Sequence, residues 1–202
     1  MNLVGRDIRK AMQQEDRDHG PLVVTPLLSD AQISDAGVDV RLGNQFIVMR
    51  NRLFGMLDPS IGPDLSVQLP RYQEFVVVPF RSTCGFVLHP GRFVISSTFE
   101  YIALPGDLEC QLEGRSSWAR LGLVAAMATT VAPGFQGVIT LEMTNLGSAP
   151  IVLHPGVRIA QLLFHTTSSP SEYAGRKYKF PIGPEFSKIH LDNELGFWAG
   201  QA

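Results

Sequence analysis

QGVITLEMTN, residues 136–145, is the clearest strand pattern in the chain, because apolar and polar side chains alternate along it. Ile139, Leu141 and Met143 form an apolar row on one face, which we expect to lie against the core. Glu142 lies in mid-strand on the opposite face, where strand propensity disfavours a carboxylate. This position leaves three interpretations open for Glu142: contact with solvent, pairing with a cation, or a catalytic role.

Similar short apolar segments recur along most of the chain, separated by turn residues. The 19 glycines and 14 prolines suit many short strands and turns better than long helices. Helical periodicity occurs only in the first dozen residues and at 116–123, and we expect residues 51–72 to form an irregular excursion. The pattern predicts a mainly β protein, a sandwich or distorted barrel with one N-terminal and one short internal helix. The expected strands are 22–24, 38–42, 46–49, 75–80, 85–88, 93–98, 101–104, 136–145, 151–153 and 157–165.

Length and charge limit the classes of protein to which the chain can belong. Its 202 residues suit a single domain spanning 1–202. Lys plus Arg number 17 and Asp plus Glu 19, and the resulting net charge of −2 argues against binding a nucleic-acid backbone. The sequence has neither an apolar N-terminal leader nor an apolar run of membrane-spanning length. We therefore expect a cytoplasmic protein that binds neither nucleic acid nor membrane.

The segment EGRSSWARLG, residues 113–122, combines two arginines with two hydroxyl groups where a turn enters a helix. Free N–H groups at a helix start favour an anion. The guanidinium groups of Arg115 and Arg120 can add forked hydrogen bonds to phosphate oxygens, and Ser116 and Ser117 lie between them. These features predict a phosphate-binding segment, and the alternative is a capped surface helix with solvated arginines.

Several segments, in order and spacing, together resemble the dCTP deaminases of the dUTPase-like superfamily. The resemblance implies a distorted β-barrel or jelly roll of the dUTPase-like type, assembled as a homotrimer with active sites between subunits. It also implies that the protein binds nucleotides of the dCTP, dUTP or dTTP type, with Mg²⁺ carried by the triphosphate. The segments that carry the resemblance are 37–44, 86–91, 114–122, 133–137, 141–142, 154–159 and 177–178.

The resemblance assigns roles to individual residues. Glu142 matches the catalytic carboxylate, while Ser116 and Arg120 would orient the water and stabilise charge in the intermediate. Residues 166–202 match a tail that closes over the nucleotide. The residues implied to bind the nucleotide are Arg115, Ser116, Ser117, Arg120, Ala132, Thr140, Leu141, Glu142, Tyr173, Lys177 and Tyr178.

The implied reaction is the hydrolytic loss of ammonia from C4 of cytosine, which converts dCTP into dUTP. The attacking water loses a proton and the departing amine gains one, so a single carboxylate can serve both steps. Zinc deaminases use the H-x-E and P-C-x-x-C motifs instead, and neither motif occurs in this sequence. We therefore expect a metal-free catalytic centre without zinc. Cys84 and Cys110 are expected to be buried free thiols, with a disulfide between them as the alternative.

The chain departs from the family pattern at three places. Ala132 stands where the family usually has an acidic residue that meets the sugar 3′-hydroxyl. Residues 128–131 lack the usual His-Arg or bulky pair, and Pro181 lies where a tail glutamine is expected. Because a dUTP diphosphatase needs the acidic residue to activate its water, a simple deaminase is favoured. A nucleotide-binding regulatory relative, a dUTP diphosphatase and a bifunctional deaminase–diphosphatase remain as alternatives.

Overall fold

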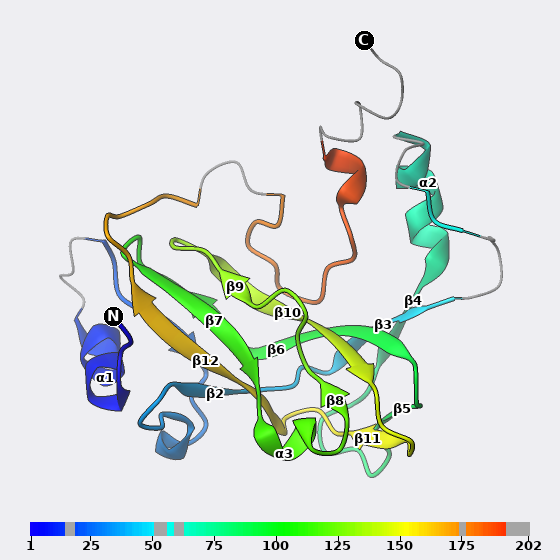
Figure 1. Ribbon diagram of the computed structural model, residues 1–202, viewed down its shortest axis with the longest axis horizontal. Coiled ribbons are helices and arrows are strands. Elements are labelled where there is room, and N and C mark those ends of the chain that lie inside the picture. Colours follow the sequence, from blue (N-terminus) through cyan, green and yellow to red (C-terminus); the bar gives the residue numbers. More distant parts are fainter. Residues whose placement is uncertain (15–18, 51–55, 59–62, 174–176, 193–202) are drawn as a thin grey trace.

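Two larger antiparallel sheets and one two-stranded sheet make up most of the computed structural model (Figure 1). The structure describes residues 1–14, 19–50, 56–58, 63–173 and 177–192. The six-stranded sheet consists of β4 (Gln73–Val77), β3 (Gln45–Met49), β6 (Phe93–Ala103), β10 (Gln136–Asn145) and β8 (Leu123–Val124), in that order, with β1 (Val23–Thr25) also paired to β6. The four-stranded sheet consists of β2 (Val38–Arg41), β12 (Arg158–Thr166), β7 (Leu108–Gly114) and β9 (Thr130–Val131). The third sheet pairs β11 (Ile151–Leu153) with β5 (Phe86–Leu88).

One hydrophobic core takes side chains from both larger sheets. Val40 and Leu162 enter it from the four-stranded sheet, and Phe46 and Leu141 enter it from the six-stranded sheet. All four are fully buried. The mainly β prediction is therefore confirmed, although the strand orders of the described residues do not close into a barrel.

Strand β10 has the predicted bounds and the predicted division of its two faces. Ile139, Leu141 and Met143 are buried, and Glu142 is half-buried on the other face. Antiparallel pairing with β6 sets Glu142 opposite Ile95. Since side chains alternate along a strand, this register turns Glu142 away from the core that holds its two apolar neighbours.

The two predicted helices are present. α1 (Gly5–Gln13) buries Ile8 and Ala11, and α3 (Ser116–Ala119) is shorter than the expected 116–123. The chain leaves α3 through Gly122, whose φ of +92° suits glycine, and enters β8 at once. Short 3₁₀ turns form η1 (Asp30–Gln32) and η3 (Ile189–Leu191).

A third helix, α2 (Pro63–Tyr72), corrects the expectation of an irregular excursion over 51–72. Leu65, Leu69 and Tyr72 follow the i, i+4, i+7 spacing of one helical face, and all three are buried. Pro70, near the end of α2, and the other prolines and glycines concealed this pattern in the sequence. The parts of the excursion at 51–55 and 59–62 lie outside the described residues.

Other differences concern strands and cysteines. The expected strands 93–98 and 101–104 are one continuous strand, β6, and the prediction omitted β7, β8 and β9. In β7, burial raises the pKa of the Cys110 thiol well above its ordinary value. Both cysteines are free, but Cys84 is exposed, so its predicted burial is wrong.

Glu100 explains why β6 was divided in the prediction, since a carboxylate interrupts the apolar pattern. Its side chain is fully buried and accepts hydrogen bonds from the backbone N–H of Arg41 at 2.7 Å and from Gln32 Nε2 at 2.9 Å. The Arg41 guanidinium adds an ion pair at 3.4 Å. A buried carboxylate requires such partners. Burial raises the pKa of Glu100 above its ordinary 4.5, although the bonds from Arg41 and Gln32 act in the opposite direction.

We expect the free energy of unfolding of the wild type to fall relative to that of Glu100→Gln as the pH rises above 4.5. In the unfolded chain Glu100 releases its proton near this pH, whereas the folded protein retains it to a higher pH. Stability is therefore lost as the pH rises through the folded pKa, and glutamine cannot titrate. Urea denaturation over a pH series measures the difference, and a difference that is constant or reversed with pH contradicts the assignment.

Candidate functional site

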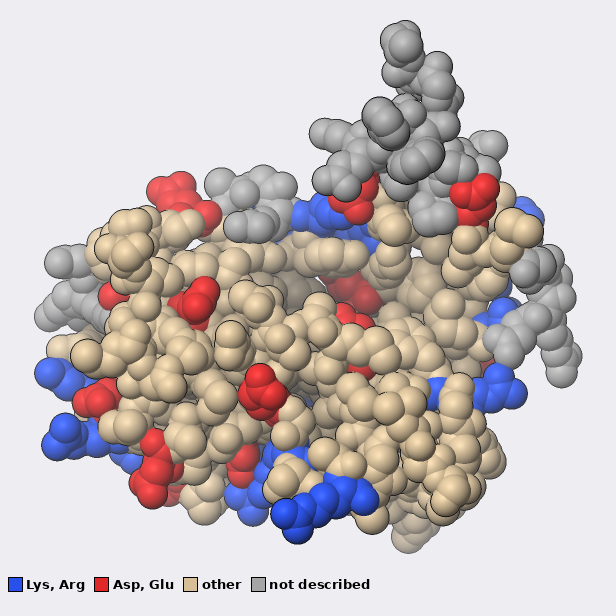
Figure 2. Space-filling model, in the orientation of Figure 1, with Lys and Arg blue, Asp and Glu red and all other residues tan. Residues whose placement is uncertain are grey.

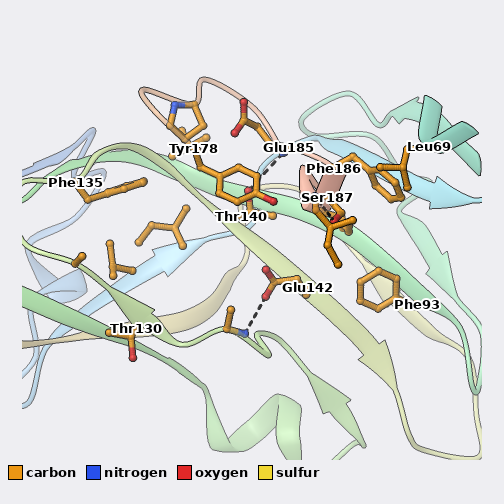
Figure 3. A pocket seen from close by; sticks show the side chains of 18 of the residues that line it. Leu69, Phe93, Thr130, Phe135, Thr140, Glu142, Tyr178, Glu185, Phe186 and Ser187 are labelled. Atoms are coloured by element: carbon orange, nitrogen blue, oxygen red, sulfur yellow. Dashed lines mark hydrogen bonds between the residues drawn. The ribbon is translucent and has the colours of Figure 1, made fainter. Parts of the chain in front are cut away.

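A cavity of about 700 Å³ lies over the face of β10 that carries Glu142 (Figure 3). Its floor comes from the six-stranded sheet, with Thr140 and Glu142 from β10 and Phe93 from β6. Helix α2 contributes Leu69 to the wall. The C-terminal segment adds Tyr178, Glu185, Phe186 and Ser187, so three parts of the chain that are distant in sequence surround the carboxylate of Glu142.

The loop before β9 holds the carboxylate of Glu142 in place. Oε2 of Glu142 accepts hydrogen bonds from the backbone N–H groups of Met127, at 3.3 Å, and Ala128, at 3.2 Å. In Figure 3 the dashed bond from Glu142 is directed away from Tyr178 and Glu185 of the tail. Two bonds to one oxygen fix the orientation of the group and leave the other oxygen available to a ligand or a water molecule.

The C-terminal segment is attached to this face of β10 by polar contacts. The backbone N–H of Glu185 donates to Thr140 Oγ1 at 3.5 Å, and the backbone N–H of Lys188 donates to the hydroxyl of Tyr178 at 2.9 Å. Lys188 Nζ lies 5.1 Å from the centre of the Tyr178 ring and pairs with Glu185 at 3.0 Å. These bonds hold Tyr178 and Glu185 over the cavity.

A second cavity, of about 530 Å³, lies beside α3. It is lined by Arg41, Arg115 and Arg158 together with Ser117 and Trp118. Lys and Arg side chains gather at the lower edge of Figure 2, the part of the molecule where Figure 1 places α3. The basic character of this cavity suits an anionic ligand.

The predicted site residues are distributed over these two cavities. Ala132, Thr140, Glu142, Tyr173 and Tyr178 line the first cavity, whereas Arg115 and Ser117 line the second. No described residue lines both.

The four remaining predicted residues line neither cavity. Ser116 and Arg120 belong to α3 and its C-cap, and the side chain of Leu141 is buried in the core. The ammonium group of Lys177 pairs with Asp192. A single chain thus assembles the surroundings of the carboxylate but not the whole predicted site.

Several residues of the two cavities were not predicted. In the first cavity, Leu69 and Phe186 form part of the apolar wall. The helical spacing of Leu65, Leu69 and Tyr72 could have identified the helix that carries Leu69. In the second cavity, nothing in the sequence indicated that Arg158 belongs to a site, because an arginine at the start of a strand fits the ordinary alternation of polar and apolar residues.

The described residues contain no group of three His, Cys, Asp or Glu side chains arranged to hold a metal ion. Within the same ranges, none of the helices has the length and apolar character that a membrane crossing requires.

Comparison with known proteins agrees with this fold. The family model described as dCTP deaminase-like matches residues 3–167. A dCTP deaminase of Haloarcula marismortui is 40% identical over 97% of this chain and 98% of its own length. A dUMP-forming dCTP deaminase of Methanobrevibacter smithii is 38% identical over 90% and 94%, respectively. The chain belongs to the dCTP deaminase-like family.

A solved structure supports the dUTPase-like fold class. The 2′-deoxycytidine 5′-triphosphate deaminase from Agrobacterium tumefaciens superposes with a TM-score of 0.59 at 25% sequence identity. The match covers 81% of this chain but only 46% of the solved chain, so this protein spans about half of that structure.

We expect Leu69→Ala to lower the free energy of unfolding by about 2–5 kcal/mol, because it removes a buried side chain from the cavity wall. Val67→Ala, on the exposed side of the same helix, is the control and should change it by no more than about 0.5 kcal/mol. Urea denaturation of both variants measures the contrast. Equal effects would show that α2 does not contribute to stability through its buried face.

Proposed function

We propose that this protein catalyses the hydrolysis of dCTP to dUTP and ammonia. The observation that carries the proposal is Glu142, a half-buried carboxylate held by two backbone N–H groups in a largely apolar cavity. Membership of the dCTP deaminase-like family supports the substrate class. The relatives' names describe the activity of those proteins, and the cavity supplies the chemical group that the same reaction needs here.

In the proposed mechanism Glu142 accepts a proton from the attacking water and returns it to the departing amine. The backbone N–H groups of Met127 and Ala128 donate to Oε2, so Oε1 is the oxygen proposed to accept and return the proton. The apolar wall and the tail reduce access of bulk water, which strengthens polar interactions inside the cavity. Backbone groups of Thr140 and Leu141 would contact the pyrimidine edge.

The phosphates would be bound by the second cavity and α3. Arg115, Ser116, Ser117 and Arg120 supply cationic and hydroxyl groups suited to a triphosphate, and Ser116 and Arg120 would also orient the water. Within one chain Arg115 and Ser117 line a different cavity from that of Glu142, and Ser116 and Arg120 line neither. A homotrimer would resolve the separation, because active sites between subunits can combine the carboxylate of one chain with the arginines of its neighbour.

Magnesium would enter with the nucleotide. The described residues offer no cluster of three carboxylate or imidazole ligands, which suits an ion carried on phosphate oxygens rather than by the protein. Such an ion neutralises phosphate charge. We expect the Mg²⁺–triphosphate to bind at the second cavity, which Arg115 lines, and to contact Lys177 and Tyr178 of the tail. Tyr178 also lines the carboxylate cavity.

The second candidate is a bifunctional enzyme that also releases pyrophosphate. Relatives named dUMP-forming are 36–40% identical to this chain, and those named simply dCTP deaminase are 38–40% identical, so identity does not separate the two activities. Ala132 lines the carboxylate cavity and has no group that could activate a second water. This residue favours dUTP as the product.

We expect Glu142→Gln to abolish ammonia release from dCTP and to leave nucleotide affinity within about threefold, because the amide keeps the shape but cannot move the proton. The assay uses dCTP, CTP and dUTP with Mg²⁺ and measures ammonia and pyrophosphate separately. Glu74→Gln, an exposed carboxylate on β4, is the control.

Each outcome of that assay has a defined meaning. Ammonia without pyrophosphate supports the simple deaminase, and both products from dCTP show the bifunctional enzyme. Binding without either product contradicts the proposal and indicates a regulatory nucleotide-binding protein. Loss of binding in step with loss of activity would make Glu142 a structural residue.

We expect Arg115→Ala to weaken dCTP binding by about tenfold or more and to leave deoxycytidine binding unchanged, since its guanidinium would contact phosphate alone. Titration calorimetry with both ligands measures the two affinities. Arg6→Ala, an exposed arginine of α1, controls for the loss of one positive charge. Equal losses for the two ligands would remove Arg115 from the phosphate site.

A further inference from the structure

Asp39, which no sequence pattern assigned to the site, lies behind the arginines of the second cavity. Its side chain is only 9% exposed although it carries a charge. Oδ1 lies 3.5 Å from Nε of Arg115, and Oδ2 lies 3.2 Å from Nη1 of Arg158. Gln161 Nε2 adds a third donor, at 3.5 Å from Oδ1. One buried carboxylate therefore contacts two guanidinium groups at once.

The two arginines come from different parts of the chain and are tied together. Arg115 is the N-cap residue of α3, and Arg158 is the first residue of β12. The backbone carbonyl of Arg158 accepts hydrogen bonds from Arg115 Nη1 at 3.4 Å and from Trp118 Nε1 at 2.9 Å. These contacts use Nε and one N–H of Nη1 in Arg115, so Nη2 and the second N–H of Nη1 are left for a ligand.

The balance of charge at this cavity is positive. Three guanidinium groups line it, and two carboxylates stand behind them, Asp39 for Arg115 and Arg158, and Glu100 for Arg41. The arginine side chains are 32% exposed at Arg115 and 39% at Arg158, whereas the carboxylates are buried. The buried anions thus fix the arginines from behind without neutralising the surface that they present.

We propose that Arg115 and Arg158 form a paired guanidinium site for the nucleotide's phosphates and that Asp39 is the residue that positions the pair. The proposal rests on the proposed function and adds Arg158 as a phosphate-binding residue. A guanidinium binds phosphate best when its planar fork is oriented in advance, since less side-chain entropy is then lost on binding. Asp39 supplies that orientation for both groups through its two oxygens.

Replacing Asp39 separates positioning from simple electrostatics, because the two effects have opposite signs. Asp39→Asn removes a negative charge near the phosphates, so charge alone predicts tighter binding of a polyanion. Positioning predicts weaker binding, since the amide nitrogen of asparagine would face one of the two guanidinium groups as donor against donor. That arginine would lose its fixed orientation.

The test measures binding of inorganic tripolyphosphate, dCTP and deoxycytidine to the full-length wild type and to Asp39→Asn, Arg158→Gln and the control Arg50→Gln. Arg158→Gln removes a half-exposed guanidinium and keeps the backbone carbonyl that holds Arg115 and Trp118. Arg50 pairs with Glu74 on the exposed side of β3 and β4, so it matches the charge change away from the second cavity. Thermal melts verify folding.

We expect about tenfold or weaker binding of tripolyphosphate and dCTP in Asp39→Asn and Arg158→Gln, with deoxycytidine and the control unchanged. Equal or tighter tripolyphosphate binding by folded Asp39→Asn overturns the positioning role, and unchanged binding by Arg158→Gln overturns the paired site. Should Asp39→Asn not fold, Arg158→Gln decides the proposal by itself. A wild type that binds tripolyphosphate but releases no ammonia contradicts the proposed function alone.

Discussion

The register of β10 against β6 is the constraint on which the carboxylate cavity depends. A shift by one residue would exchange the faces of Leu141 and Glu142, placing a charge in the core and an apolar side chain in the cavity. The pairing has an irregularity between Val138 and Thr140, and there the N–H of Ile139 donates to Thr98 Oγ1 at 2.9 Å. This bond satisfies the backbone where the ladder is interrupted, and it fixes the alternation that follows.

Buried carboxylates on the strands behind the second cavity impose a related constraint. Glu100 and Asp39 are both enclosed by protein, so each requires donors, and arginines provide part of the requirement in both cases. The consequence is that the guanidinium groups at this surface are oriented by the folding of β2 and β6. The arginines are thus oriented when the chain folds, before any ligand binds.

Much of the fold and of the carboxylate's position could be predicted because they depend on local alternation. The bounds of β10 and the placement of Glu142 on the face opposite the apolar row followed from period two, whereas its half-burial comes from the loop, helix and tail around it. Helix α2 was missed because Pro70 and the neighbouring turn residues argued against a helix. The helical spacing of Leu65 and Leu69 was a weak signal in the sequence, and only their burial in the structure shows what it meant. Asp39 could not have been identified from sequence, since its partners lie 76 and 119 positions away in the chain.

The separation of the predicted site into two cavities has a physical consequence for the proposed reaction. Proton transfer needs a partly dehydrated carboxylate, which a largely apolar wall provides, whereas phosphate binding needs exposed cations. In a single small cavity that had to meet both requirements, the arginines would form ion pairs with Glu142 itself. In this chain they pair instead with Asp39 and Glu100, so Glu142 keeps only backbone donors at Oε2 and remains free of a competing ion pair among the described residues. In the homotrimer proposed above, the phosphates would contact the arginines of one subunit while the pyrimidine contacts Glu142 of its neighbour, and the proposed catalysis would then require subunit assembly.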